Sequence, residues 1–189
     1  MKQLLFILAL TFSMAVSAQD RKALETDAAR FYNNTTTGKY EALIADTYPE
    51  IFKIIPKEKM MEGLKAMLKG DGYVMDILEE PANFNFGEIK QINSGSYCII
   101  KHDLVMKMTF LEPLGEAEAK EMVKNLKASM KTEDVTFNPK YNSFTIKQKA
   151  DIIAISNANT TGKWKFLNRA GHGLMTKVLG EEVCKELAL

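Results

Sequence analysis

The sequence has no excess of charge of either sign and few metal-binding residues, and these shortages exclude several classes of protein. Its 25 basic and 24 acidic residues are interleaved, so no surface is predicted to bind nucleic acid or an anionic membrane. The two Cys and two His have no ligand-like spacing, so we expect no metal and no cofactor. The motifs Gly-x-Ser-x-Gly and His-Glu-x-x-His are missing as well, which removes two common hydrolase signatures.

Residues 1–18 have the features of a secretory signal peptide. Lys2 gives a positive start, residues 4–16 form an apolar run, and Val16-Ser17-Ala18 places small residues before a cut at Gln19. The run is too short for a membrane anchor, and no later stretch is apolar enough to cross a bilayer. We therefore predict an exported protein, periplasmic or extracellular, with one domain over residues 19–189.

The two cysteines, Cys98 and Cys184, follow the signal peptide, so they would reach a compartment where disulfides form. One interpretation joins them. The other, which we favour, treats them as two buried thiols that pack as small apolar side chains.

The most informative stretch is residues 96–111, which contains no Gly or Pro and is rich in residues that favour strands. Its even positions from Cys98 to Phe110 are apolar except for His102, and several odd positions are polar. Because strand side chains alternate between faces, this pattern predicts a long strand with one buried face. His102 is the one titratable group on that face, and its neighbour Asp103 should point to the opposite face.

Periodicity and turn residues predict the other elements as helices first, then an antiparallel meander with one inserted helix, then a C-terminal helix. This order indicates an α+β fold in which N-terminal helices pack on a curved antiparallel sheet. The last helix could divide at Gly180, and His172 is expected on the loop before it. The expected helices are 20–35, 40–48, 57–69, 116–130 and 174–187, and the expected strands are 73–79, 84–92, 96–111, 135–138, 142–155 and 163–168.

With this order, the chain resembles the nuclear-transport-factor-2-like (cystatin-like α+β) superfamily, and in particular its exported bacterial members. The residues that carry the resemblance are Phe31-Tyr32 in the first helix, the break at Gly38-Lys39-Tyr40, the switch to strands near Gly72, and the closing segment Gly162-Lys163-Trp164-Lys165-Phe166. The resemblance implies a sheet wrapped around helices in a cone whose open end holds a ligand pocket. Enzymes of the superfamily place carboxylates, His or Tyr there, whereas other members bind partners or dimerise.

The candidate site follows from the polar residues that could reach such a pocket. His102 is the candidate acid or base. Tyr32, Tyr48, Gln148 and Asn168 are the candidate ligand-binding residues, as hydrogen-bond partners. The alternative for His102 is a core histidine held neutral by one or two hydrogen bonds, and this alternative is the stronger of the two.

Three functions remain open from the sequence. The first is a non-catalytic exported module that binds a small apolar ligand or a protein partner in an apolar pocket. The second is a cofactor-independent lyase or isomerase that uses His102. The third is a structural homodimer, because the apolar residues Ile99, Val105, Ile153 and Ile155 on the outer strand faces suggest a covered surface.

Overall fold

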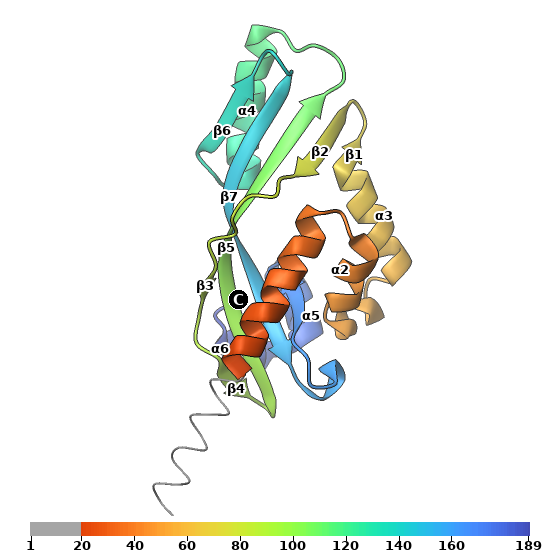
Figure 1. Cartoon of the computed structure of the whole chain (residues 1–189), viewed down its shortest axis with the longest axis vertical. Helices are drawn as coiled ribbons and strands as arrows, with labels where there is room; N and C mark the ends of the chain where they lie inside the picture. The colour runs from red at the N-terminus through yellow and green to blue at the C-terminus, as the bar shows by residue number, and fades with distance from the viewer. Residues whose placement is uncertain (1–19) are drawn as a thin grey trace, which may run out of the picture.

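Two long antiparallel strands, β5 (Gly95–Phe110) and β7 (Ser143–Ser156), run along most of the length of the molecule (Figure 1). The structure is a computed structural model that describes residues 20–189, so the predicted signal peptide lies outside the described residues. The two strands pair from Ser96 opposite Ser156 to Thr109 opposite Ser143. This ladder confirms the long strand and the face alternation predicted from the sequence.

Shorter strands flank the ladder at its two ends and leave its middle uncovered by further strands. At one end, β2 (Tyr73–Ile77) pairs with β5 and β6 (Asp134–Asn138) pairs with β7. β1 (Lys69–Gly70) pairs with β2. At the other end, β3 (Asn85–Phe86) and β4 (Lys90–Ile92) pair with β5, and β8 (Lys165–Asn168) pairs with β7. All strand pairs within residues 20–189 are antiparallel. We call the two-stranded middle, around the rungs His102–Ala150 and Leu104–Gln148, the waist.

The helices agree with the predicted order and make the fold α+β. A helix over residues 20–36 is followed by α2 (Tyr40–Asp46), the 3-10 turn η1 (Pro49–Lys53) and α3 (Lys57–Leu68). α4 (Glu116–Met130) is the inserted helix, and the short turn η2 (Ala158–Thr160) precedes β8. No helix within residues 20–189 combines the length and the apolar character that a bilayer span requires.

The C-terminal segment differs from the prediction in one respect. It forms α5 (His172–Leu179) and α6 (Glu181–Glu186), separated by Gly180 at a positive φ of 88°. The division at Gly180 was expected, but His172 is the first residue of α5 and does not lie on the preceding loop. The helix begins two residues earlier than its apolar stripe because Gly171 takes the cap position.

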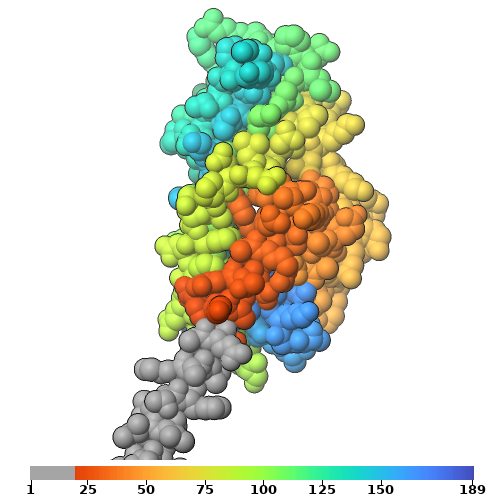
Figure 2. Space-filling model, viewed as in Figure 1, coloured from red at the N-terminus to blue at the C-terminus, as the bar shows by residue number. Residues whose placement is uncertain are grey.

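The lower half of the ladder is the half that carries β3 and β4 (Figure 1). Its inner face, which holds the even-numbered residues of the two long strands, packs against the helix over residues 20–36. Cys98 and Ile100 of β5 join Ile152 and Ala154 of β7, and all four are at most 1% exposed. The helix contributes Leu24, Ala28 and Phe31, and β8 and its approach contribute Trp164 and Phe166. Figure 2 shows the helix (red to orange) against the segment that follows β2 (yellow to yellow-green). We call this group the inner cluster.

The outer face of the same half is covered by the C-terminal helices. Tyr97, Ile153 and Ile155 pack with Met175 and Val178 of α5, and α6 adds Val183 and Cys184. Ile153 and Ile155 are fully buried, so burial on both faces explains their apolar character, as in strands covered on two sides. The residues from which a homodimer is predicted are thus largely covered by the chain itself. We call this group the outer cluster.

A third cluster lies at the other end of the ladder, under α4. Met106, Met108, Phe144 and Ile146 of the two long strands pack against Ala119 and Leu126 of the helix, together with Met75 and Val135 from the flanking strands. These residues occupy the even positions of β5 and β7 that the sequence predicts as buried. The predicted helix 116–130 has the predicted bounds.

The predicted strand 84–92 is divided by a β-bulge. β3 pairs with β5 in the register Phe86–Ile100, and β4 pairs in the register Lys90–Tyr97. Gly87 N–H donates to Ile99 O, so Gly87 lies opposite Ile99. The three steps from Gly87 to Lys90 therefore lie opposite the two steps from Ile99 to Tyr97, which is the extra residue of a bulge. The extra residue reverses the faces, which lets Ile89 join Phe86 against the inner cluster.

A partly buried ion pair ties the first helix to α2. Arg30 donates from Nε and Nη2 to the carboxylate of Asp46 over 3.0 and 3.1 Å, and Asn34 Nδ2 donates to it over 3.3 Å. Asp46 is 9% exposed. The hydrogen bonds satisfy a carboxylate that would otherwise be costly to bury.

Replacing Asp46 by Ala is expected to lower the free energy of unfolding by about 1–2 kcal/mol. The change removes these charged hydrogen bonds, and the exposure of Arg30 limits the loss. Urea unfolding measures it. The matched control is Glu62→Ala, which removes an exposed pair with Lys59 and should change stability by less than about 0.5 kcal/mol. Equal effects from the two substitutions would contradict this role for Asp46.

Candidate functional site

His102 lies in the waist, where the strands pass from the cover of the first helix to that of α4. Its side chain is buried at 5% exposure. The ring of Tyr32 packs edge-on at 5.4 Å between centroids, and Phe84 lies at 6.1 Å. Tyr32 Oη donates to the carbonyl of Glu80 over 3.0 Å. The structure thus brings together two of the predicted site residues, in an aromatic contact.

The protonation of His102 follows from its one hydrogen bond. Nδ1 lies 3.0 Å from the carbonyl oxygen of Asp103. Since a carbonyl can only accept, Nδ1 carries the proton and Nε2 has the lone pair. Burial lowers the pKa of His102 below its ordinary value near 6.5, against the opposing influence of the Asp103 carbonyl and carboxylate. The imidazole is therefore neutral at pH 7.

The second polar exception of the long strands, Gln148, lies two rungs from His102, on the same face of the ladder. His102 pairs with Ala150, and Gln148 pairs with Leu104. Both polar residues fall between the inner cluster and the cluster under α4. This position explains why the alternation of apolar residues fails at the same point in two strands.

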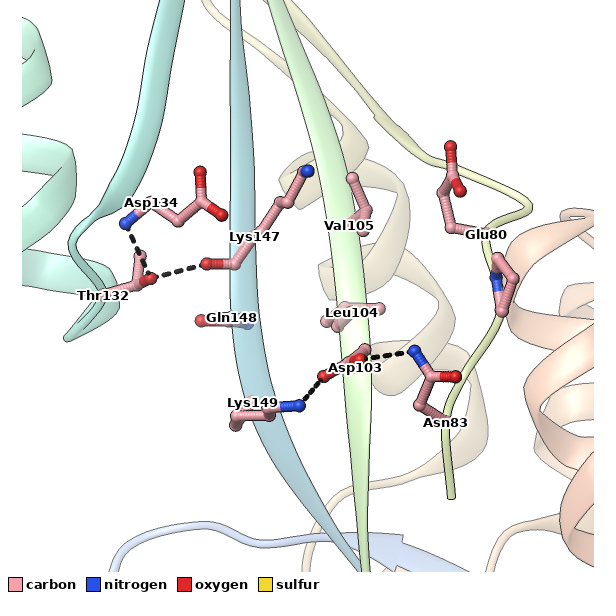
Figure 3. Close-up of a pocket in the computed structure, with 11 residues that line it drawn as sticks. Glu80, Asn83, Asp103, Leu104, Val105, Thr132, Asp134, Lys147, Gln148 and Lys149 are labelled. Carbon is pink, nitrogen blue, oxygen red and sulfur yellow. Dashed lines mark hydrogen bonds and ion pairs between the residues drawn. The ribbon is translucent and has the colours of Figure 1, made fainter. Parts of the chain in front are cut away.

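A polar groove crosses the waist and has a volume of about 480 Å³. Figure 3 shows its floor on β5 and β7, with residues 80–83 on one side and the start of β6 on the other. Asp103 forms an ion pair with Lys149 and accepts a hydrogen bond of 2.7 Å from Asn83 Nδ2. The hydrogen bond from Lys149, followed by that from Asn83, lowers the pKa of the Asp103 carboxyl. This carboxylate is occupied by the chain's own groups, so it is a poor proton acceptor for a substrate.

Gln148 lines this polar groove, whereas His102 does not. Asp103 is adjacent to His102 in β5 and so points to the opposite face, as expected from strand alternation. The groove holds acidic and basic side chains together, including Glu80, Asp134 and Lys147, and this mixture favours no single sign of ligand charge.

A separate apolar cavity of about 260 Å³ lies between the N-terminal helices, β8 and α5. Its walls come from the first helix, α2, η1, α3, β8 and α5. The polar side chains among the lining residues are those of Thr47 and Asn168, and no lining residue is charged. The remaining lining residues are Phe31, Leu43, Ile44, Ile51, Ile55, Met60, Leu64, Phe166, Leu167, Ala170, Leu174 and Met175.

The five predicted site residues therefore do not converge. Asn168 lines the apolar cavity, and Gln148 lines the polar groove. Tyr32 and His102 contact each other but line neither of them. Tyr48 is buried in the outer cluster, where its hydroxyl accepts a hydrogen bond of 2.9 Å from Asn157 Nδ2. Its role there is to join η1 to the end of β7.

The sequence did not identify most of the residues that line the apolar cavity. The helical periodicity of residues 57–69 predicted α3, and the structure shows that none of the residues of α3 is buried. Met60 and Leu64 line the cavity, and Met60 also packs against the edge of the outer cluster. An apolar stripe shows that a helix has an apolar side, but it does not show whether side chains or a hollow lie beneath it.

The cysteines and possible metal ligands are also placed. Cys98 and Cys184 are both free and buried, in the inner and outer clusters respectively, which agrees with the favoured interpretation. Within residues 20–189, no three His, Cys, Asp or Glu side chains are grouped so that they could hold a metal ion.

Comparison of the chain with protein-family models and with curated proteins finds no match. The resemblance to the nuclear-transport-factor-2-like superfamily therefore stays a prediction.

His102 should make stability depend on pH. Its folded pKa is lower than its unfolded pKa, so the unfolded chain binds more protons and stability falls as the pH drops below about 6.5. The slope is expected to reach at most about 1.4 kcal/mol per pH unit. Urea unfolding between pH 7.5 and 5 measures it.

The variant His102→Gln should flatten this slope, because it removes the titrating group. The matched control is His172→Gln, at an exposed histidine, which should keep it. A slope that persists in His102→Gln would show that another group controls stability in this range.

Proposed function

We propose that the protein is a non-catalytic exported binding module that holds a small apolar ligand in the cavity between α2, α3, β8 and α5. The single observation that carries this proposal is the uncharged apolar lining of that cavity. Ligand sites are concave and mostly apolar, with few polar groups that orient the ligand. Export is proposed from the predicted signal peptide alone.

The lining limits the chemistry of the ligand. Burying a charge without a partner is very unfavourable, and the cavity offers no charged side chain. The hydroxyl of Thr47 already donates to the carbonyl of Leu43 over 2.9 Å, so it can only accept. The ligand is therefore uncharged in the part that enters the cavity.

The volume limits the size of the ligand. A cavity of about 150 Å³ can hold benzene, so the 260 Å³ found here suits roughly ten non-hydrogen atoms by the same ratio. This is smaller than most drug-sized ligands, and the affinity of so small a group is limited in proportion.

The geometry favours binding over catalysis. A general acid or base must lie within hydrogen-bonding reach of its substrate. His102 lines neither the apolar cavity nor the polar groove. The lyase or isomerase alternative therefore has no space for a substrate beside its proposed acid or base in either of them.

Filling the cavity should abolish binding of a small apolar probe. Ala170 is exposed and lines the cavity, so Ala170→Leu would occupy its volume without disturbing a packed core. Toluene is the probe, and an NMR titration of the ¹⁵N-labelled chain should show saturable shifts at the cavity residues. We expect at least about tenfold weaker binding in Ala170→Leu.

The matched control is Ala66→Leu, at an exposed position on α3 that does not line the cavity. It should bind toluene as the unmodified chain does. If toluene produces no saturable shifts in the unmodified chain, or if Ala170→Leu binds it equally well, the proposed site is wrong.

A further inference from the structure

The edge of β8 that faces away from β7 bears directly on what the cavity binds. Arg169 N–H donates to the carbonyl of Asp151 over 2.9 Å. In an antiparallel pair, hydrogen-bonded and non-hydrogen-bonded residue pairs alternate. In the register Ala154–Phe166 and Ile152–Asn168, the backbone N–H and C=O of Phe166 and Asn168 therefore point away from β7.

Within the described part of the chain, residues 20–189, this edge is covered at Phe166 only. Tyr48 N–H donates to the carbonyl of Phe166 over 2.9 Å, and Thr47 forms a parallel bridge with the same residue. The chain then turns away into η1, which begins at Pro49. Among the hydrogen bonds within residues 20–189, none involves the outward N–H or C=O of Asn168.

The apolar cavity begins where this cover stops. Asn168 lines it, and its walls include Phe31 from the inner cluster side and Met175 from the outer cluster side. The cavity thus occupies the place that the next strand of the sheet would take beyond β8.

We propose that the cavity binds one uncharged apolar residue of an extended peptide, which pairs with the backbone of Asn168. This inference rests on the proposed function and names its ligand class. In a strand, the N–H and C=O of one residue point the same way, so one peptide residue can donate to the Asn168 carbonyl and accept from the Asn168 N–H. The main chain then provides the orientation, and the apolar walls select an aliphatic side chain.

The first test compares two ligands that differ in one group. The first is N-acetyl-leucine methylamide, and the second is its depsipeptide analogue, in which an ester oxygen replaces the leucine N–H. An NMR titration of the ¹⁵N-labelled chain follows the Asn168 amide. The analogue should bind about three- to tenfold more weakly, because it leaves the Asn168 carbonyl without a donor.

The second test changes the protein. Asn168→Pro removes the outward N–H without removing a ladder hydrogen bond, and proline is tolerated on such an edge. Its matched control, Asn168→Ala, keeps that N–H. Each variant's affinity for the leucine amide is compared with its own affinity for toluene, because Asn168 lines the cavity. On that ratio the proline variant should bind the leucine amide about three- to tenfold more weakly than the alanine variant.

The outcomes separate this inference from the function on which it rests. If toluene binds but the leucine amide does not, or if the amide and the ester bind equally, the peptide ligand is wrong and the apolar site stands. Equal ratios of the two affinities in the proline and alanine variants would also overturn it. Failure of toluene to bind overturns the site itself. If the proline variant does not fold, the comparison of the two ligands on the unmodified chain decides.

Discussion

Everything else in the fold depends on the pairing of β5 with β7. These two strands carry apolar residues on both faces of the lower half and on one face of the upper half. Because side chains alternate in a strand, a shift of one residue in this register would exchange the faces of all three clusters at once. The fully buried isoleucines on the ladder each contribute about 1.5–3 kcal/mol through burial, so the register is strongly specified.

The ladder also determines where sites can form. The helices cover its two ends, and the waist between them has polar residues on both strands. The polar groove crosses the ladder there, whereas the apolar cavity lies beyond the edge of β8. Both hollows therefore arise where the cover of the sheet is interrupted, one in its middle and one at its margin.

Much of this fold could be predicted from the sequence, because its main elements have local signals. The alternation in β5, the stripe of α4 and the glycine at 180 each predicted the correct element. The bulge after Gly87 could not be predicted, because it depends on a register set by the partner strand.

Less of the candidate site than of the fold could be predicted from the sequence. Asn168 was predicted as a ligand-binding residue from its side chain, but the outward direction of its backbone depends on the pairing of β8. His102 was correctly placed on a buried face, whereas the absence of convergence with Tyr48 and Gln148 is a property of the tertiary structure.

The placement of the two thiols has a consequence for how the chain matures. Cys98 lies on one face of the sheet and Cys184 packs on the other, so the sheet itself separates them. Burial also raises the pKa of the Cys98 thiol, which keeps it protonated and slow to react with oxidants. The native fold can therefore be reached without oxidative folding catalysts, and it has the same covalent structure in a reducing cytosol as in an oxidising compartment. Export would change the surroundings of this protein but not the state of its two thiols.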